Sequence, residues 1–148
     1  MRRLATIIVS IAGLISLDYF SKKYMEGFLR LEDIYLVGEF LKLHLSYNSG
    51  IAFSLPITGI ALQLITVILV AILLVYYYRI EYHKNVYLLD VAYSLIIAGA
   101  LSHAYERISF GYVIDFISVK YFAILNFADI FISIGACLLF IAYYARKQ

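Results

Sequence analysis

The sequence predicts an all-α membrane protein: four transmembrane helices with a small outer β-structure and an interfacial helix, in a single domain over residues 1–148. Composition is the first reason, because 64% of the residues are hydrophobic and mean hydropathy is +0.89. Only 15% are charged, against about 25% in soluble domains. A soluble domain of this length has too little interior for so much apolar surface. The second reason is that the apolar residues form four separate segments.

These segments cover residues 4–17, 57–78, 86–104 and 127–145. The last three are long enough to cross the hydrocarbon core, which takes about 20 helical residues. The first is shorter and follows two arginines, as in a secretory signal peptide, but no A-x-A-like cleavage site comes after it. We therefore expect a retained first helix that ends near Asp18, with Tyr19 and Phe20 extending it toward the interface.

The connection over residues 21–56 is predicted to be structured. Residues 22–31, KKYMEGFLRL, are typical of a short helix lying in the interface. Residues 41–47 alternate leucine or tyrosine with Lys42, His44 and Ser46, which indicates a half-buried strand with these three polar side chains on its water-exposed face. Asn48-Ser49-Gly50 then predicts a turn.

Orientation follows from the position of the basic residues. Lys and Arg are equally numerous on the two sides, but those on the side of the termini all lie in short segments near helix ends, where the positive-inside bias acts. We therefore expect both termini in the cytoplasm and the 21–56 and 105–126 connections outside. The tyrosines near residues 76–82 and 143–144 would form an aromatic belt on the inner side.

Several kinds of partner are excluded or disfavoured. The net charge is only +2 and there is no Lys/Arg run, so no nucleic-acid partner is expected. One cysteine, Cys137, allows no internal disulfide. His103-x-x-Glu106 is one metal-ligand pair, but the other histidines lie in different loops, so we expect no metal and no cofactor. No G-x-S-x-G motif supports a serine nucleophile at Ser102.

Polar residues gather at the outer ends of the predicted spans, where a four-helix bundle would bring them around one site. Two aspartates, Asp115 and Asp129, lie in the otherwise largely apolar stretch 111–131. A carboxylate in such a setting is paired, protonated or functional. The other candidates at this end are Asp18, Lys22, Asn48, Gly50, His103, Glu106, Arg107 and Asn126.

Each candidate also has a structural interpretation. Asp18 and Lys22 have the spacing of an i,i+4 ion pair, and Asn126 with Asp129 resembles a helix N-cap with an acidic first turn. Glu106 and Arg107 would form a solvated interfacial pair. Asp90, near the other face, would snorkel or bind a tyrosine.

A function from another class is also considered. A small four-helix transporter or channel could use acidic residues to bind cations or protons, and such a protein would be expected to have carboxylates near the bilayer middle.

The blocks LDYFSK, YNSGIAFSL, AGALSHAYERISFGYVIDF and NFADIFI resemble, in order and spacing, the signature blocks of lipoprotein signal peptidases (signal peptidase II). The resemblance covers nearly the whole chain. It implies a four-helix aspartyl endopeptidase of the bacterial cytoplasmic (inner) membrane, with an extracytoplasmic β-cradle and its active site at that face. It implies Asp115 and Asp129 as the catalytic pair, with the other eight candidates supporting them or binding substrate. The implied substrate is a prolipoprotein, cut before its diacylglyceryl-modified cysteine; membrane lipids are the other partners, and we expect a monomer.

Two positions depart from the family pattern G-N-x-x-D-R: His103 replaces its asparagine and Glu106 its aspartate. The chemistry itself needs only the two carboxylates. Held close together, they share one proton, so that the ionised member activates a water and the protonated member polarises the scissile carbonyl.

Overall fold

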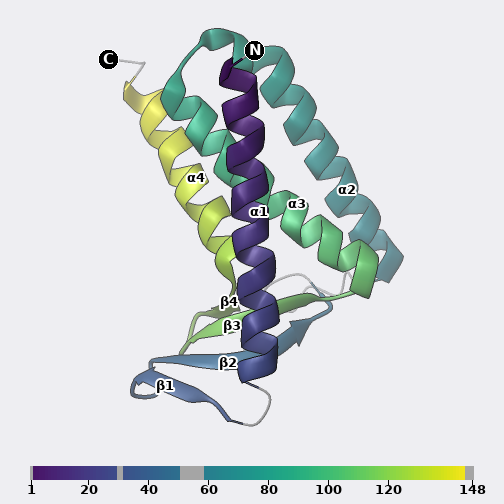
Figure 1. The fold of residues 1–148 in the computed structure, drawn as a ribbon, viewed down its shortest axis with the longest axis vertical. Helices are drawn as coiled ribbons and strands as arrows, with labels where there is room; N and C mark the ends of the chain where they lie inside the picture. Colours follow the sequence, from purple (N-terminus) through teal and green to yellow (C-terminus); the bar gives the residue numbers. More distant parts are fainter. Residues whose placement is uncertain (1, 30–31, 51–58, 146–148) are drawn as a thin grey trace.

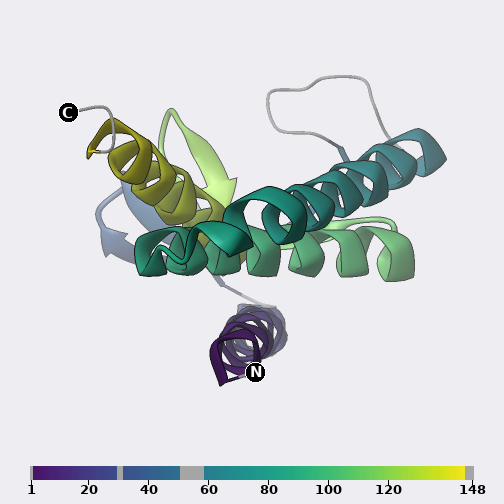
Figure 2. The same cartoon turned by 90° about the horizontal axis from the view of Figure 1, so that it is seen from above.

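The computed structural model describes residues 2–29, 32–50 and 59–145. Four helices are long and apolar enough to cross a membrane, as the sequence predicts. They are α1 (Arg2–Phe28), α2 (Gly59–Tyr76, continued by the π-helical turn η2, Tyr77–Glu81, and the 3-10 turn η3, Tyr82–Lys84), α3 (Tyr87–Phe110) and α4 (Phe127–Ala145). The first two residues expected in the second span, 57 and 58, lie outside the described residues. Viewed along the helices, α3 lies between α1 on one side and α2 and α4 on the other (Figure 2).

Helix α1 is longer than expected. The predicted end near Asp18 and the separate interfacial helix over residues 22–31 are both wrong, because α1 runs without a break to Phe28. The charges at Asp18 and Lys22 do not mark a boundary, since both side chains are buried. A 27-residue helix spans about 40 Å, more than the roughly 30 Å hydrocarbon core. Its last turns therefore extend alongside the sheet (Figure 1).

A four-stranded antiparallel sheet lies at the end of the bundle opposite the termini (Figure 1). Its order is β1 (Ile34–Val37), β2 (Leu41–Asn48), β3 (Val113–Val119) and β4 (Ala123–Leu125). The strand predicted over residues 41–47 is confirmed as β2. The sheet joins the two connections over residues 21–56 and 105–126, because β2 comes from the first and β3 from the second.

A β-bulge changes which side chains of β2 face the same way. Leu43 opposes Ile117 but Ser46 opposes Asp115, so three steps along β2 match two along β3. Cross-strand partners point to the same side of a sheet, so Ser46 lies on the side of Leu43. The predicted alternation is therefore wrong from the bulge onward. Its consequence is that Asn48 shares a side with Asp115, which strict alternation would prevent.

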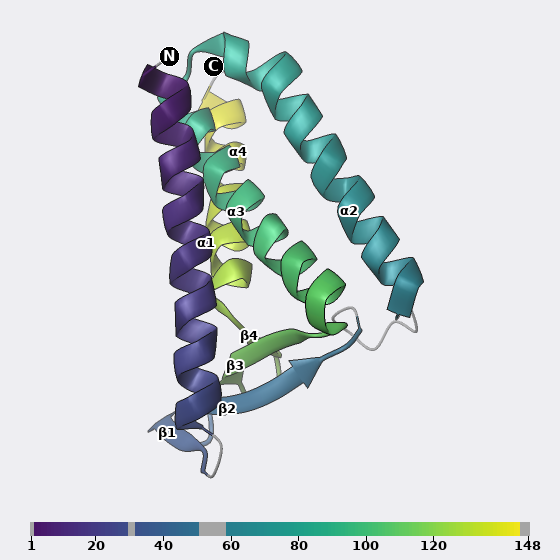
Figure 3. The same cartoon turned by 45° about the vertical axis from the view of Figure 1, so that its right-hand side comes forward.

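Two glycines allow α3 and α4 to pack closely. A Cβ atom on Gly99 would lie 2.5 Å from the carbonyl oxygen of Ala128, and one on Gly135 would lie 2.7 Å from that of Ala92. Any larger residue would have to push the helices apart. Because of this close packing, the start of α4 lies fixed against the half of α3 that is nearer the sheet (Figure 3).

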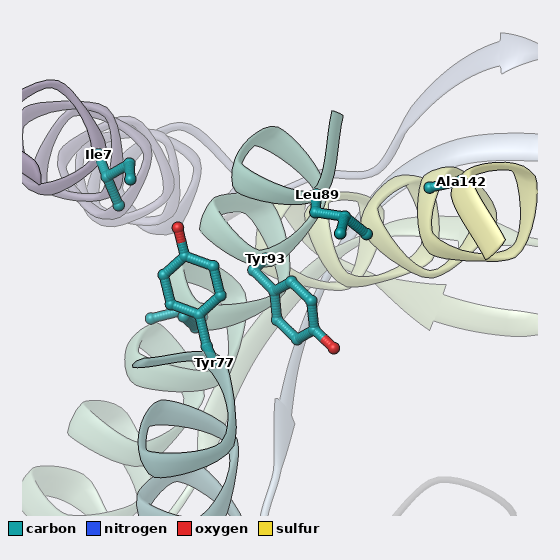
Figure 4. Close-up of a cluster of buried hydrophobic side chains, with 6 residues drawn as sticks. Ile7, Tyr77, Leu89, Tyr93 and Ala142 are labelled. Atoms are coloured by element: carbon teal, nitrogen blue, oxygen red, sulfur yellow. The ribbon is translucent and has the colours of Figure 1, made fainter. Parts of the chain in front are cut away.

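An apolar cluster and a partly buried ion pair join the helices at the end of the bundle away from the sheet. The cluster comprises Ile7, Tyr77, Leu89, Tyr93, Ile97 and Ala142 (Figure 4). Beside it, Nε and Nη2 of Arg3 donate to Asp90 at 2.7 and 2.6 Å, and the Tyr77 hydroxyl donates at 2.8 Å. The interpretation that Asp90 binds a tyrosine is confirmed, and its partner Arg3 was not foreseen.

Candidate active site

Asn126 contacts both aspartates of the predicted pair. Asp115 lies on β3, Asp129 in the first turn of α4, and Asn126 just before that helix. The side-chain amide of Asn126 donates to Oδ1 of Asp115 at 2.6 Å, and its backbone N–H donates to Oδ2 of Asp129 at 3.0 Å. The structure therefore brings together two carboxylates that are 14 positions apart in the sequence (129 − 115).

The cap interpretation of Asn126 and Asp129 is confirmed as well. The backbone N–H of Asp129 donates to Oδ1 of Asn126 at 3.1 Å, which completes a reciprocal capping box with the bond from the Asn126 N–H to Asp129. The helix N-terminus favours a negative charge at Asp129. Asp129 can both cap the helix and belong to the site, because the bonds of the cap orient its carboxylate.

Asp115 occupies an interior position. Its residue is 4% exposed, and Oδ2 accepts a 3.2 Å bond from the side-chain amide of Asn48. Burial raises the pKa of Asp115 to about 6; the bond from Asn48 opposes that rise, the negative charge of Asp129 adds to it, and the bond from Asn126 again opposes it. Burial therefore favours the protonated form of Asp115.

The turn predicted at residues 48–50 carries Asn48 to Asp115. The backbone N–H of Gly50 donates to Oδ1 of Asn48 at 3.1 Å, and Nη2 of Arg107 donates to the Gly50 carbonyl at 3.1 Å. Arg107 thus holds the turn from the end of α3. Gln63, which sequence reasoning missed, donates to the Arg107 carbonyl at 2.7 Å. The available signal was a lone amide in an otherwise apolar span.

His103 reaches the α4 side of the pair. Its Nε2 lies 3.3 Å from Oδ1 of Asn126 and 3.6 Å from Oδ1 of Asp129. The residue that departs from the family pattern therefore lies beside one of the two aspartates. A neutral imidazole can donate to Asn126 there, and a protonated one adds a positive charge beside Asp129.

A second group, Asp18, Lys22 and Glu106, holds the backbone on which the aspartates stand. Nζ of Lys22 lies 2.7 Å from Asp18 and 2.5 Å from Glu106, and all three side chains are buried. Asp18 accepts the backbone N–H of Ala128 at 2.9 Å, and Glu106 accepts that of Ile114 at 3.3 Å. Each acceptor thus fixes the residue that precedes one aspartate of the pair.

These contacts decide between the earlier interpretations. The i,i+4 ion pair of Asp18 and Lys22 is confirmed. The solvated pair of Glu106 with Arg107 is wrong, because Glu106 is buried and its charge partner is Lys22. The two residues are adjacent in the sequence, but consecutive side chains of a helix point about 100° apart, so Glu106 and Arg107 do not face each other.

A largely apolar groove lies beside this site. It has a volume of about 360 Å³ and runs between α2, α3 and α4. Its lining includes His103 and Arg107 at one end, and Thr66, Leu69, Val70, Leu73, Ala100 and Ile132 elsewhere. Within residues 2–29, 32–50 and 59–145, no three His, Cys, Asp or Glu side chains are grouped as metal ligands would be.

Comparison with known proteins gives a consistent result. Residues 10–145 match the family model described as signal peptidase (SPase) II. The chain is 34% identical to a lipoprotein signal peptidase of Pseudomonas fluorescens, over 99% of this chain and 91% of that protein. It is 36% identical to one of Clostridium tetani, over 91% of this chain and 89% of that protein.

Solved structures agree with this result. One described as a bacterial membrane enzyme at 2.3 Å resolution matches with a TM-score of 0.83 and 27% identity, over 97% of this chain and 90% of the other. A second, at 1.9 Å resolution, matches with a TM-score of 0.79 and 26% identity, over 94% and 92% of the two chains.

Proposed function

The chain belongs to the signal peptidase II family, and on this premise we propose that Asp115 and Asp129 are its catalytic pair. The protein is an aspartic-type membrane peptidase that removes signal peptides from bacterial prolipoproteins. The observation that carries the assignment of the pair is that one residue, Asn126, bonds both carboxylates.

The two carboxylates have different surroundings and hence different roles. Asp115 is buried with a raised pKa, so it carries the shared proton and gives it to the scissile carbonyl oxygen as water adds. It regains a proton from a hydroxyl of the tetrahedral intermediate when the C–N bond breaks. Asp129 is half-exposed in the first turn of α4, where water can reach it, so it takes a proton from the attacking water and passes it to the leaving amine. The pair titrates as one coupled unit and needs neither a covalent intermediate nor a metal.

The substrate is a prolipoprotein cut before its diacylglyceryl-modified cysteine. Its apolar signal segment would enter from the bilayer along the groove between α2, α3 and α4, which ends at His103 and Arg107. Arg107, Asn48 and Gly50 form the wall beside Asp115, and Arg107 Nε is buried without a hydrogen-bond partner among the described residues. That N–H is free to bind a substrate carbonyl.

The proposed topology places both termini in the cytoplasm and the sheet outside. The described ends of α1 and α4 lie at the end opposite the sheet, and Arg2, Arg3, Arg79 and Lys84 belong to that end (Figure 1). We propose one peptidase domain over residues 1–148 that acts as a monomer, because the bonds that hold Asp115 and Asp129 need no residue from a second copy.

A transporter or channel is not favoured. Helix α2 carries no acidic residue, α3 none between Asp90 and Glu106, and α4 none after Asp129. The carboxylates of these three helices thus lie near their ends, where they do not form a path across the bilayer.

Cleavage of a defined peptide tests the proposed function. The purified protein in lipid is incubated with a diacylated prolipoprotein peptide, and the products are identified by mass spectrometry. We expect one cut, immediately before the lipid-modified cysteine. The same peptide without the lipid is the control, and a cut elsewhere or no cut at all would contradict the proposal.

A further inference from the structure

The end of the sheet farthest from Asn48, where the strands turn in two hairpins, carries exposed apolar side chains. This surface consists of Leu36, Val37 and Phe40 from the β1–β2 hairpin and Tyr121 and Phe122 from the β3–β4 hairpin, and we call it the hairpin surface. Tyr121 is 94% exposed and Phe122 66%. The two hairpins are joined, because the backbone N–H of Lys120 donates to the Phe40 carbonyl at 2.9 Å.

Tyr121 combines an unfavourable backbone conformation with an almost fully exposed aromatic side chain. Tyr121 has φ +64°, the left-handed region that a tight turn normally gives to glycine or asparagine. A tyrosine there costs of order 1 kcal/mol or more, and its ring gains almost no burial within the chain. Both the strain and the exposure are accounted for if the ring packs against something outside the chain.

The exposed residues at the end of α1 indicate how deep the hairpin surface lies relative to the bilayer. Phe20, Tyr24 and Phe28, in the last three turns of α1, are all exposed, so one face of this helix remains apolar to its end. Those turns lie beside the sheet in two views (Figures 1 and 3). The sheet therefore lies at the depth of the interface, where tyrosine and phenylalanine are favoured and lysine can extend to the headgroups.

We propose that the hairpin surface is a second membrane anchor, which inserts its side chains into the interfacial region of the lipid leaflet on the sheet side. Lys120 fits this environment, since its Nζ lies 5.4 Å from the centre of the Tyr121 ring and can reach a lipid phosphate. Glu39 lies in the other hairpin and offsets the charge of Lys120. Binding to the lipid therefore depends on the aromatic and apolar area of the surface and not on its net charge.

The anchor would fix the depth of the proposed site. Asp115 and Val119 belong to the same strand, and Tyr121 follows two residues after its end. A strand held at the interface by its hairpin keeps Asp115 level with the headgroups, where the peptide bond before a diacylated cysteine lies. This consequence rests on the proposed function, but the anchor itself does not.

The chain contains no tryptophan, so a single introduced tryptophan reports on its own surroundings. Tyr121→Trp and Phe122→Trp are each reconstituted in phosphatidylcholine bilayers with and without bromine on the acyl chains near the headgroup. Phe20→Trp, on the exposed surface of α1, is the lipid-facing control. His44→Trp, on the polar part of β2 beside Asp33, is the water-facing control.

We expect brominated lipid to quench both hairpin tryptophans strongly, as it does Phe20→Trp, and to leave His44→Trp emission nearly unchanged. Hairpin tryptophans that are quenched by aqueous iodide and not by brominated lipid would overturn the proposal. Tryptophans shielded from both quenchers, with emission that shifts on dilution of the protein in lipid, would also overturn it, because a second copy of the chain would then cover the surface. No arm of this experiment depends on cleavage.

Discussion

Nε2 of His103 lies 3.6 Å from Oδ1 of Asp129, at the point where the outer end of α3 meets the start of α4. Histidine can take up a proton, so this contact allows the charge beside Asp129 to depend on pH. The other charged groups near it are Lys22 and Asp18 on α1, and Arg107, which lines the same groove.

His103→Asn should keep cleavage and simplify its pH dependence. Asparagine retains a donor for Asn126 but does not titrate, so we expect kcat/KM at pH 7 to change by less than about 10-fold and one step of the pH profile to disappear. The measurement is kcat/KM against pH for both proteins. Superimposable profiles would show that His103 does not influence the reaction.

Asn126→Ser separates the two roles of Asn126. Serine keeps the helix cap but cannot reach Asp115, so Asp115 loses a donor that stabilises its ionised form, and its pKa rises above about 6. Because Asp115 acts in its protonated form, we expect the fall of kcat on the alkaline side to move to higher pH. We also expect kcat to drop about 10-fold or more from lost positioning, since bonds to charged groups contribute about 1.5–3 kcal/mol.

Thermal unfolding controls for damage to the helix. Asn126→Ala removes both the cap and the donor, so it should lower Tm further than Asn126→Ser does. A Ser variant with the wild-type pH profile would contradict the proposed role of the Asn126 amide.

Lys22→Met should strongly destabilise the fold. It leaves Asp18 and Glu106 buried without a counter-charge, which we expect to cost about 3–5 kcal/mol. The neighbouring Lys23 forms an exposed pair with Glu26, so Lys23→Met should cost less than about 1 kcal/mol. The comparison is Tm in the same detergent, and equal values for the two variants would argue against a buried ion-pair group.

Gly99→Ala should disturb the site through packing alone. Its methyl would meet the Ala128 carbonyl and the side chain of Ile132, so α4 must shift next to Asp129. We expect a loss of about 1–3 kcal/mol in stability and a fall of roughly 10- to 100-fold in kcat. Gly13→Ala is the matched control, because nothing lies within 4 Å of a Cβ there. If both variants behave alike, the close approach of α3 and α4 does not position the site.

The sequence predicts the four spans, the outer strand and the residues of the site because each has a local signal: hydropathy, alternation or a motif. Three features depend on contacts between residues that are far apart in the sequence. The charges at Asp18 and Lys22 look like a helix end until Glu106, 84 positions after Lys22, is seen beside them. The bulge in β2 depends on pairing with β3, and so does the side on which Asn48 lies. Gln63 acts on a carbonyl of another helix, which hydropathy does not encode.

The central claim is that Asp115 and Asp129 act as one acid–base pair, and turnover of single variants tests it most directly. Asp115→Asn and Asp129→Asn should each lower kcat for a diacylated prolipoprotein peptide by about 100- to 10,000-fold, with folded protein retained in the membrane. Asp33→Asn, which removes an aspartate that binds Lys42 and His44 on the sheet, should leave kcat close to wild type. Near-normal turnover by either Asp115→Asn or Asp129→Asn would contradict the claim.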